Sequence, residues 1–143
     1  MKNLILIVAL LSVLGSGAAN AQSRMMAKSG ETVWIFINPV KADKREQFEK
    51  FLHEIFWPGA KKLSAADQKV FRQTRILHPT KPENDGSYAY IFVMDPVIDG
   101  ADYDIPSLLK KMYGEAKGME YNELFESSLN GPQIGYIEKQ SKD

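Results

Sequence analysis

The chain contains no cysteine and only 2 histidines among its 143 residues. Without cysteine there can be no disulfide bond, thiolate metal site, iron–sulfur cluster or cysteine nucleophile, and no lipoprotein anchor attached at a cysteine. Two histidines are too few for a three-histidine zinc site, and no HExxH spacing occurs. The sequence therefore predicts no bound metal.

An excess of either charge is also lacking, since 18 Lys and Arg balance 18 Asp and Glu. A balanced chain has no basic field that would attract nucleic acid. No GxGxxG, P-loop or GxSxG pattern occurs, so nucleotide cofactors and serine-hydrolase chemistry have no support, and we expect no cofactor. The length and the 44% hydrophobic content are typical of one globular domain.

The first 21 residues have the pattern of a secretory signal peptide. Lys2 provides a positive start, Leu4–Leu14 is an apolar run, and Ala19-Asn20-Ala21 resembles a cleavage site. A membrane anchor is the alternative, but a spanning helix needs about 20 apolar residues and this run is shorter. We therefore expect a periplasmic or secreted protein that is not held in the membrane after cleavage.

The remaining sequence is expected to comprise a flexible lead-in at 22–30, a domain at 31–139 and a short tail at 140–143. Hydrophobic periodicity and turn-forming residues divide that domain into alternating elements. The expected elements are a strand at Thr32–Asn38, a helix from Asp43 that ends or kinks at Pro58, strands at Val70–His78 and Ser87–Met94, helical structure broken by glycine over Ile105–Leu129, and a strand at Gln133–Lys139.

This order of elements predicts an α+β, ferredoxin-like βαββαβ fold, with an antiparallel sheet and both helical regions on one face. The first and third strands are the most apolar, which places them at the centre in the order 4-1-3-2. We expect Val33, Ile35 and Ile37 to face the helices, and Trp34 and Phe36 to face away from them. Because monomers rarely expose so large an apolar face, we expect a second copy of the chain to cover it in a homodimer.

Three segments carry a resemblance to a known superfamily: TVWIFINPV (Thr32–Val40), FEKFLHEIFWPGAKKL (Phe48–Leu63) and SYAYIFVMDP (Ser87–Pro96). With these segments and its element order, the region 31–139 resembles the dimeric α+β barrel superfamily. Its members include antibiotic-biosynthesis-type monooxygenases, EthD-like proteins, NIPSNAP-like proteins and stress-response barrel proteins. The resemblance implies a fold and face-to-face pairing of two sheets, but these members differ widely in function.

The resemblance also implies a candidate catalytic set. In cofactor-independent monooxygenases of this fold, an Asn on the first strand can act on the substrate together with a Trp and a His. Asn38, Trp57 (or Trp34) and His78 are the corresponding residue types here. Each also has a purely structural interpretation: Asn38 could begin a turn, Trp57 could cover the helix end before Pro58, and His78 could be a solvated strand end.

Further residues suggest a binding site. His53 shares a helix flank with Glu46 and Glu49, which suits either a histidine–carboxylate pair or an ordinary helix shoulder. Arg72 and Arg75 either bind an anionic ligand such as a carboxylate or reach solvent from an edge strand. We expect the pocket between the sheet face opposite the helices and the segment after the third strand. The candidate ligand-binding residues are Trp34, Phe36, His53, Arg72, Arg75, Tyr88 and Tyr90.

Three functions remain open at this point. The protein is an exported homodimer that binds a small apolar or aromatic molecule, an enzyme of monooxygenase type on the same fold, or a non-catalytic interaction module of the cell envelope. Whether it is an enzyme is left undecided by the sequence.

The signal pattern generates a direct prediction. The mature protein should begin at Gln22, because cleavage should follow the Ala19-Asn20-Ala21 motif. The intact mass of the periplasmic or secreted protein measures this, and an exported chain that retains Met1 would contradict it.

Overall fold

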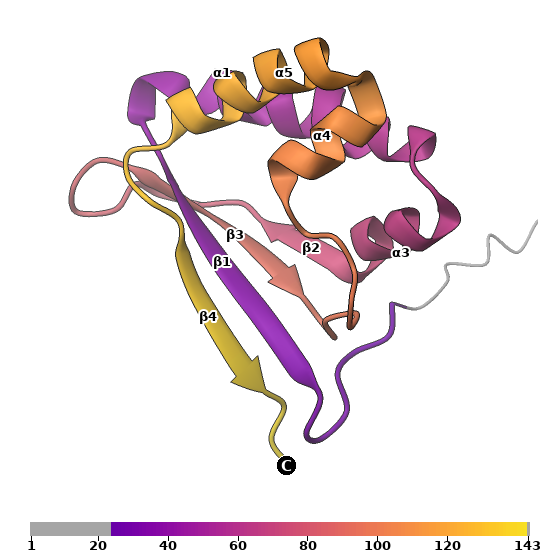
Figure 1. The fold of residues 1–143 in the computed structure, drawn as a ribbon. Helices are drawn as coiled ribbons and strands as arrows, with labels where there is room; N and C mark the ends of the chain where they lie inside the picture. The colour runs from indigo at the N-terminus through magenta and orange to yellow at the C-terminus, as the bar shows by residue number, and fades with distance from the viewer. Residues whose placement is uncertain (1–23, 143) are drawn as a thin grey trace, which may run out of the picture.

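The computed structural model describes residues 24–142, which form one antiparallel sheet of four strands with helices packed on one of its faces (Figure 1). The expected signal sequence at 1–21 lies outside the described residues. In chain order the elements are β1 (Thr32–Val40), η1 (Ala42–Lys44), α1 (Arg45–Lys50), the π-helical η2 (Phe51–Phe56), α2 (Trp57–Gly59), η3 (Ala60–Lys62), α3 (Ala65–Gln73), β2 (Thr74–Leu77), β3 (Tyr88–Met94), α4 (Ile105–Tyr113), α5 (Glu115–Ser128) and β4 (Ile134–Lys139).

The strand order β2-β3-β1-β4 confirms the predicted ferredoxin-like α+β fold. β1 pairs with β3 on one side and with β4 on the other, and β2 completes the sheet beside β3, all antiparallel. The two central strands are apolar on both faces, as expected for strands with neighbours on each side and packing above or below. Among the described residues, no helix is both long and apolar enough to cross a lipid bilayer.

The sequence predicts that the first helical region ends or kinks at Pro58; it does not end there but continues to Lys62. The hydrogen-bonding pattern changes from π to α type at Trp57, directly before the proline. Pro58 then lies in the first turn of α2, where proline is best tolerated in a helix. The Tyr113 hydroxyl donates to the Ile55 carbonyl at 2.6 Å and satisfies an acceptor in this irregular stretch.

The predicted strand at Val70–His78 is wrong in its first half, which forms the end of α3. Ser64 caps this helix, because its side-chain oxygen accepts a hydrogen bond from the Asp67 amide at 3.1 Å. Val70 and Phe71 belong to this helix and their side chains are buried, and the strand begins only at Thr74. The last four residues of this helix, 70–73, are few and mixed in polarity, so their sequence pattern does not distinguish a helix from the alternation of a strand.

The faces of β1 are the reverse of those predicted. Trp34 and Phe36 pack against the core under the helices, and Asn38 and Val40 on the same face are fully buried. The prediction failed because both faces of β1 are apolar. The alternation of side chains along a strand shows which residues share a face, but it does not show which face meets the helices.

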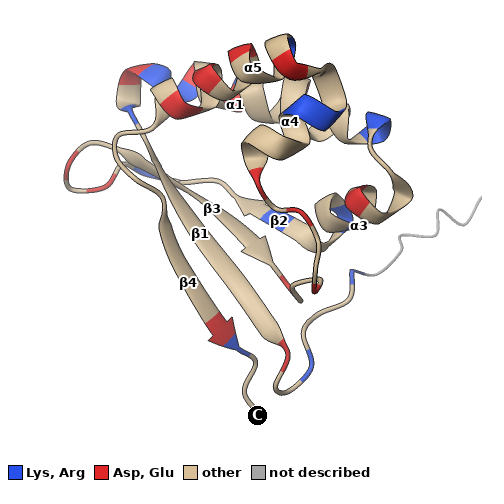
Figure 2. Cartoon of the chain, in the orientation of Figure 1, with Lys and Arg blue, Asp and Glu red and all other residues tan. Residues whose placement is uncertain are grey.

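The opposite face of the sheet is apolar and carries no helix of the described residues (Figure 1). Cross-strand pairing brings Ile37 beside Ile91 and Ile134, and Ile35 beside Tyr136. Figure 2 shows charged residues mainly on helices and loops, and β1 and β3 contain none. The expected open apolar face therefore exists, but other side chains form it. The apolar residues of this face, called the open face below, are Val33, Ile35, Ile37, Leu77, Ala89, Ile91, Val93, Ile134 and Tyr136. The same register places two charged residues, Arg75 and Glu138, on this face at the edge strands β2 and β4.

Glycine interrupts the second helical region at one position only. Gly114 adopts φ +82° and separates α4 from α5. Gly118 remains within α5, where it lies against the backbone of α4: a Cβ there would come within 2.8 Å of the Lys110 amide nitrogen. The two helices therefore depend on the missing side chain for their close approach.

Replacing Gly118 by Ala should lower the free energy of unfolding by about 1–3 kcal/mol, because overpacking against a rigid backbone outweighs the better helix propensity of alanine. Urea denaturation measures the change. Gly131→Ala is the matched control, since a Cβ at Gly131 meets no atom within 4 Å. A Gly118→Ala protein as stable as the wild type would show that α4 and α5 separate without cost.

Candidate functional site

A cavity of about 330 Å³ lies between the helix-facing side of the sheet and the helices. Its walls are mostly aromatic and aliphatic side chains from β1, β3, α3, α4 and α5. Trp57, at the junction of η2 and α2, forms another part of the wall. The apolar lining residues are Trp34, Phe36, Phe56, Trp57, Val70, Phe71, Phe92, Met94, Tyr103, Ile105, Pro106, Leu108 and Phe125.

The loop between β3 and α4 supplies one wall of this aromatic cavity. The Tyr103 ring lies 5.2 Å from the Trp34 ring, centroid to centroid. The Tyr103 hydroxyl accepts a hydrogen bond from the Ile98 amide at 2.9 Å, which holds the loop over the sheet. Burial raises the pKa of the Tyr103 phenol. The ring therefore remains neutral and contributes an apolar surface with one polar tip.

A few polar groups reach the cavity among the apolar ones. These are the side chains of Thr74, Asp104, Glu126 and Gln133. The Gln133 amide donates to the Asn38 side-chain oxygen at 2.6 Å, and the Asn38 amide donates to the Tyr90 carbonyl at 3.3 Å. Asn38 is fully buried and does not line the cavity, so its role in this arrangement is to hold Gln133 at the cavity wall.

Three of the predicted site residues meet in the cavity: Trp34 and Phe36 from β1, and Trp57. The predicted position of the pocket was wrong with respect to the sheet, since the cavity lies under the helices and not on the open face. The segment after β3 does line it, as expected. His78 and Asn38 do not, so the structure does not gather the set Asn38, Trp57 and His78 around one cavity.

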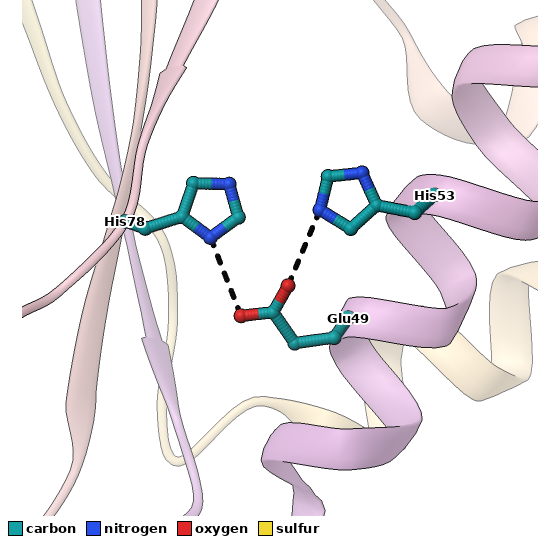
Figure 3. Close-up of side chains that lie close together, drawn as sticks. All are labelled: Glu49, His53 and His78. Atoms are coloured by element: carbon teal, nitrogen blue, oxygen red, sulfur yellow. Dashed lines mark hydrogen bonds and ion pairs between the residues drawn. The ribbon is translucent and has the colours of Figure 1, made fainter.

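A second cluster joins both histidines to one carboxylate (Figure 3). Glu49 lies between the two rings: one oxygen is 3.2 Å from His53 Nε2 and the other is 3.3 Å from His78 Nδ1. The imidazole rings face each other at 5.4 Å between centroids. Glu49, and not Glu46, is thus the carboxylate partner of His53, and the structure adds His78 from the end of β2.

Tyr90 connects this cluster to the core. Its ring is fully buried and its hydroxyl donates to Glu49. Partial burial raises the pKa of the Glu49 carboxyl, but hydrogen bonds to Tyr90 and His78 and the nearby histidines outweigh it and hold that pKa below its ordinary value. Burial, and next the bond to Glu49, raise the pKa of the Tyr90 phenol. The Tyr90 hydroxyl therefore stays protonated and donates its hydrogen bond to the Glu49 carboxylate.

The remaining predicted binding residues are dispersed. Arg72 is exposed in the last turn of α3, and Arg75 forms an ion pair with Asp95 at 2.8 Å. The Arg45 guanidinium lies 4.0 Å from the centre of the Tyr88 ring. None of Arg72, Arg75 and Tyr88 lines the aromatic cavity.

The sequence did not indicate Phe71 or Tyr103 as site residues, and it indicated Glu49 only as one of two possible carboxylate partners of His53. Phe71 falls in the predicted strand at Val70–His78, and Tyr103 falls in a segment for which no regular structure is predicted, so neither could be placed in a cavity. The spacing of Glu49 and His53 on one helix is visible in the sequence, but only the folded chain brings His78 to the same carboxylate.

The sequence matches no protein-family model and no curated protein. Among solved structures it is similar to a crystal structure described as a "putative antibiotic biosynthesis monooxygenase" from Caulobacter crescentus CB15. The two share 13% sequence identity with a TM-score of 0.41, over 78% of this chain and 91% of that chain. The ferredoxin-like fold of this protein is established by its own strand order.

Proposed function

We propose that this protein is exported and binds a small, largely apolar aromatic molecule in the aromatic cavity. The observation that carries the proposal is the cavity itself, whose walls include both tryptophans of the chain. Its volume of about 330 Å³ is within the range of small-molecule sites, about 300–1,000 Å³.

The distribution of polar groups supports the same class of ligand. Apolar side chains dominate the walls, and a few hydrogen-bonding groups lie among them: the neutral side chains of Thr74 and Gln133 and the acidic ones of Asp104 and Glu126. Such a site favours a ring system with one or two polar substituents, because each unpaired polar group of the ligand would lose its hydrogen bonds to water.

The monooxygenase alternative has less support from the geometry. Of Asn38, Trp57 and His78, only Trp57 lines the cavity, and the amide of Asn38 is already bonded to Gln133 and to the Tyr90 carbonyl. Catalysis of that type therefore remains a prediction from the sequence resemblance. A pure interaction module remains the other alternative, and it would not require an aromatic cavity.

Ligand binding can be followed by intrinsic fluorescence, because both tryptophans, Trp34 and Trp57, line the cavity. Titration with indole, 2-naphthol and 1-naphthoate should give saturable changes with at least one compound. Phe36→Ala should weaken that binding by about tenfold, since a lost aromatic contact is worth about 0.5–1.5 kcal/mol.

Ile37→Ala is the matched control, because Ile37 is the next residue along β1 and its side chain lies on the open face. It should bind the compound as the wild type does. If no compound saturates, or if Phe36→Ala binds as tightly as the wild type, the cavity is not the binding site.

We further propose that a second copy of this chain covers the open face. Leu77, Ile134 and Tyr136 on this face are 46%, 48% and 48% exposed. An apolar sheet face of this extent is covered in most soluble proteins. Packing this face against the same face of another copy would bury the apolar side chains of both sheets, with a two-fold axis relating the two copies.

Ile35→Asp should convert dimers to monomers, because it places a charge at the centre of the proposed interface. Sedimentation velocity at micromolar concentration measures the oligomeric state. Met119→Asp, which changes an exposed apolar residue on α5, should leave the dimer intact. Monomeric wild-type protein under these conditions would contradict the proposed partner.

A further inference from the structure

Both histidines of the chain converge on a single carboxylate, although they come from separate elements. Glu49 belongs to α1, His53 to the π-helical η2, and His78 directly follows β2. π-Helical segments are rare and occur frequently at functional sites. Chain folding, and not sequence proximity, thus assembles two imidazole nitrogens and a carboxylate into one group whose ligand atoms all lie within 4.8 Å of one another.

The distances within this group suit a metal ion. In a tetrahedral zinc site with bonds of about 2.0–2.1 Å, neighbouring ligand atoms are separated by about 3.3–3.5 Å. The two histidine-to-carboxylate distances, 3.2 and 3.3 Å, are already close to that separation. The two histidines approach different oxygens of Glu49, so a bound ion would require the carboxylate to coordinate through both oxygens or to turn one oxygen toward both nitrogens. The histidine nitrogens would also have to approach each other, and both histidine side chains are about half exposed and therefore have room to rotate.

A buried residue orients the carboxylate, as outer-shell groups do in metal sites. The Tyr90 hydroxyl donates to Glu49 from a ring that is fully buried and packs 4.7 Å from Phe48, centroid to centroid. The Arg45 guanidinium lies 3.4 Å from the same hydroxyl. The cluster therefore has a rigid support behind it, while its open side faces solvent.

The open side is a surface groove lined by His53 and His78 together with Trp57 and Thr74. Arg24 and Arg75 also line this groove, and Arg75 is paired with Asp95 at 2.8 Å. Trp57 and Thr74 also line the aromatic cavity, so they stand between the two sites. With three protein ligands, a bound ion would keep a coordination position for water or for a ligand in the groove.

We propose that Glu49, His53 and His78 form a binding site for a divalent transition-metal ion of the zinc type. Two imidazoles and one carboxylate are a borderline ligand set that suits Zn²⁺ and its first-row neighbours better than Mg²⁺ or Ca²⁺, which prefer oxygen ligands. The sequence predicts no metal because it contains neither three histidines nor an HExxH spacing, whereas the third ligand here follows a distant strand.

Isothermal titration of the full mature chain, carrying no histidine tag, with ZnCl₂ tests this site. One Zn²⁺ should bind per chain and raise the Tm, since an ion that binds only the folded state stabilises it. MgCl₂ should give no saturable binding. Tyr90→Phe should weaken Zn²⁺ affinity by about 10–100-fold, as the loss of an outer-shell partner does.

Glu49→Gln, His53→Ala and His78→Ala should each weaken Zn²⁺ binding by more than Tyr90→Phe does. Glu46→Gln, an exposed carboxylate of the same helix, is the matched control and should bind as the wild type does. The Tm of each metal-free variant shows that it is folded. The proposal is overturned if the wild type shows no saturable Zn²⁺ binding, or if the three ligand variants bind Zn²⁺ as tightly as the wild type does. It is also overturned if the wild type binds Mg²⁺ as tightly as Zn²⁺.

Discussion

The central strands β1 and β3 are apolar on both faces, and this imposes two separate requirements for burial on one small sheet. The helices satisfy the first by packing on the face that carries Phe92 and Val40. Coverage is incomplete toward Trp34 and Phe36, where the aromatic cavity lies. The second requirement concerns the open face, which we propose is met by another copy of the chain. The cavity and the proposed interface thus follow from the same strand composition.

The overall fold could be predicted because it depends on features that are local in sequence. The order of the elements, the polarity of the edge strands and the turn formers at 79–86 led to the correct strand order. The face assignment of Trp34 and Phe36 could not be predicted, since it depends on which of two apolar faces the helices meet. The secondary structure of Val70 and Phe71 could not be predicted either. These residues are helical because Ser64 caps α3 and because both side chains are buried from a helix.

The candidate site was less predictable than the fold, for a related reason. The aromatic residues of the cavity were recognisable as apolar, but a cavity arises from the spaces between elements, which no single segment specifies. The cluster of Glu49, His53 and His78 illustrates this: the helical pair is visible as a four-residue spacing. The third member, His78, follows a strand distant in sequence, and only the folded chain brings its ring to 3.3 Å from the Glu49 carboxylate.

Asn38 has a consequence for how the sheet finds its alignment. A strand that is apolar on both faces offers little to distinguish one pairing alignment from another two residues away, because the same kind of side chain returns to each face. The buried amide of Asn38 removes that degeneracy: its oxygen accepts from Gln133 and its nitrogen donates to the Tyr90 carbonyl only when β1 is correctly aligned with both neighbours. A slipped alignment would bring Phe36 or Val40 into this place and would deprive the buried Asn38 amide of these partners, at a cost of about 1–3 kcal/mol. A single polar residue in an otherwise apolar strand thereby specifies the register of the sheet.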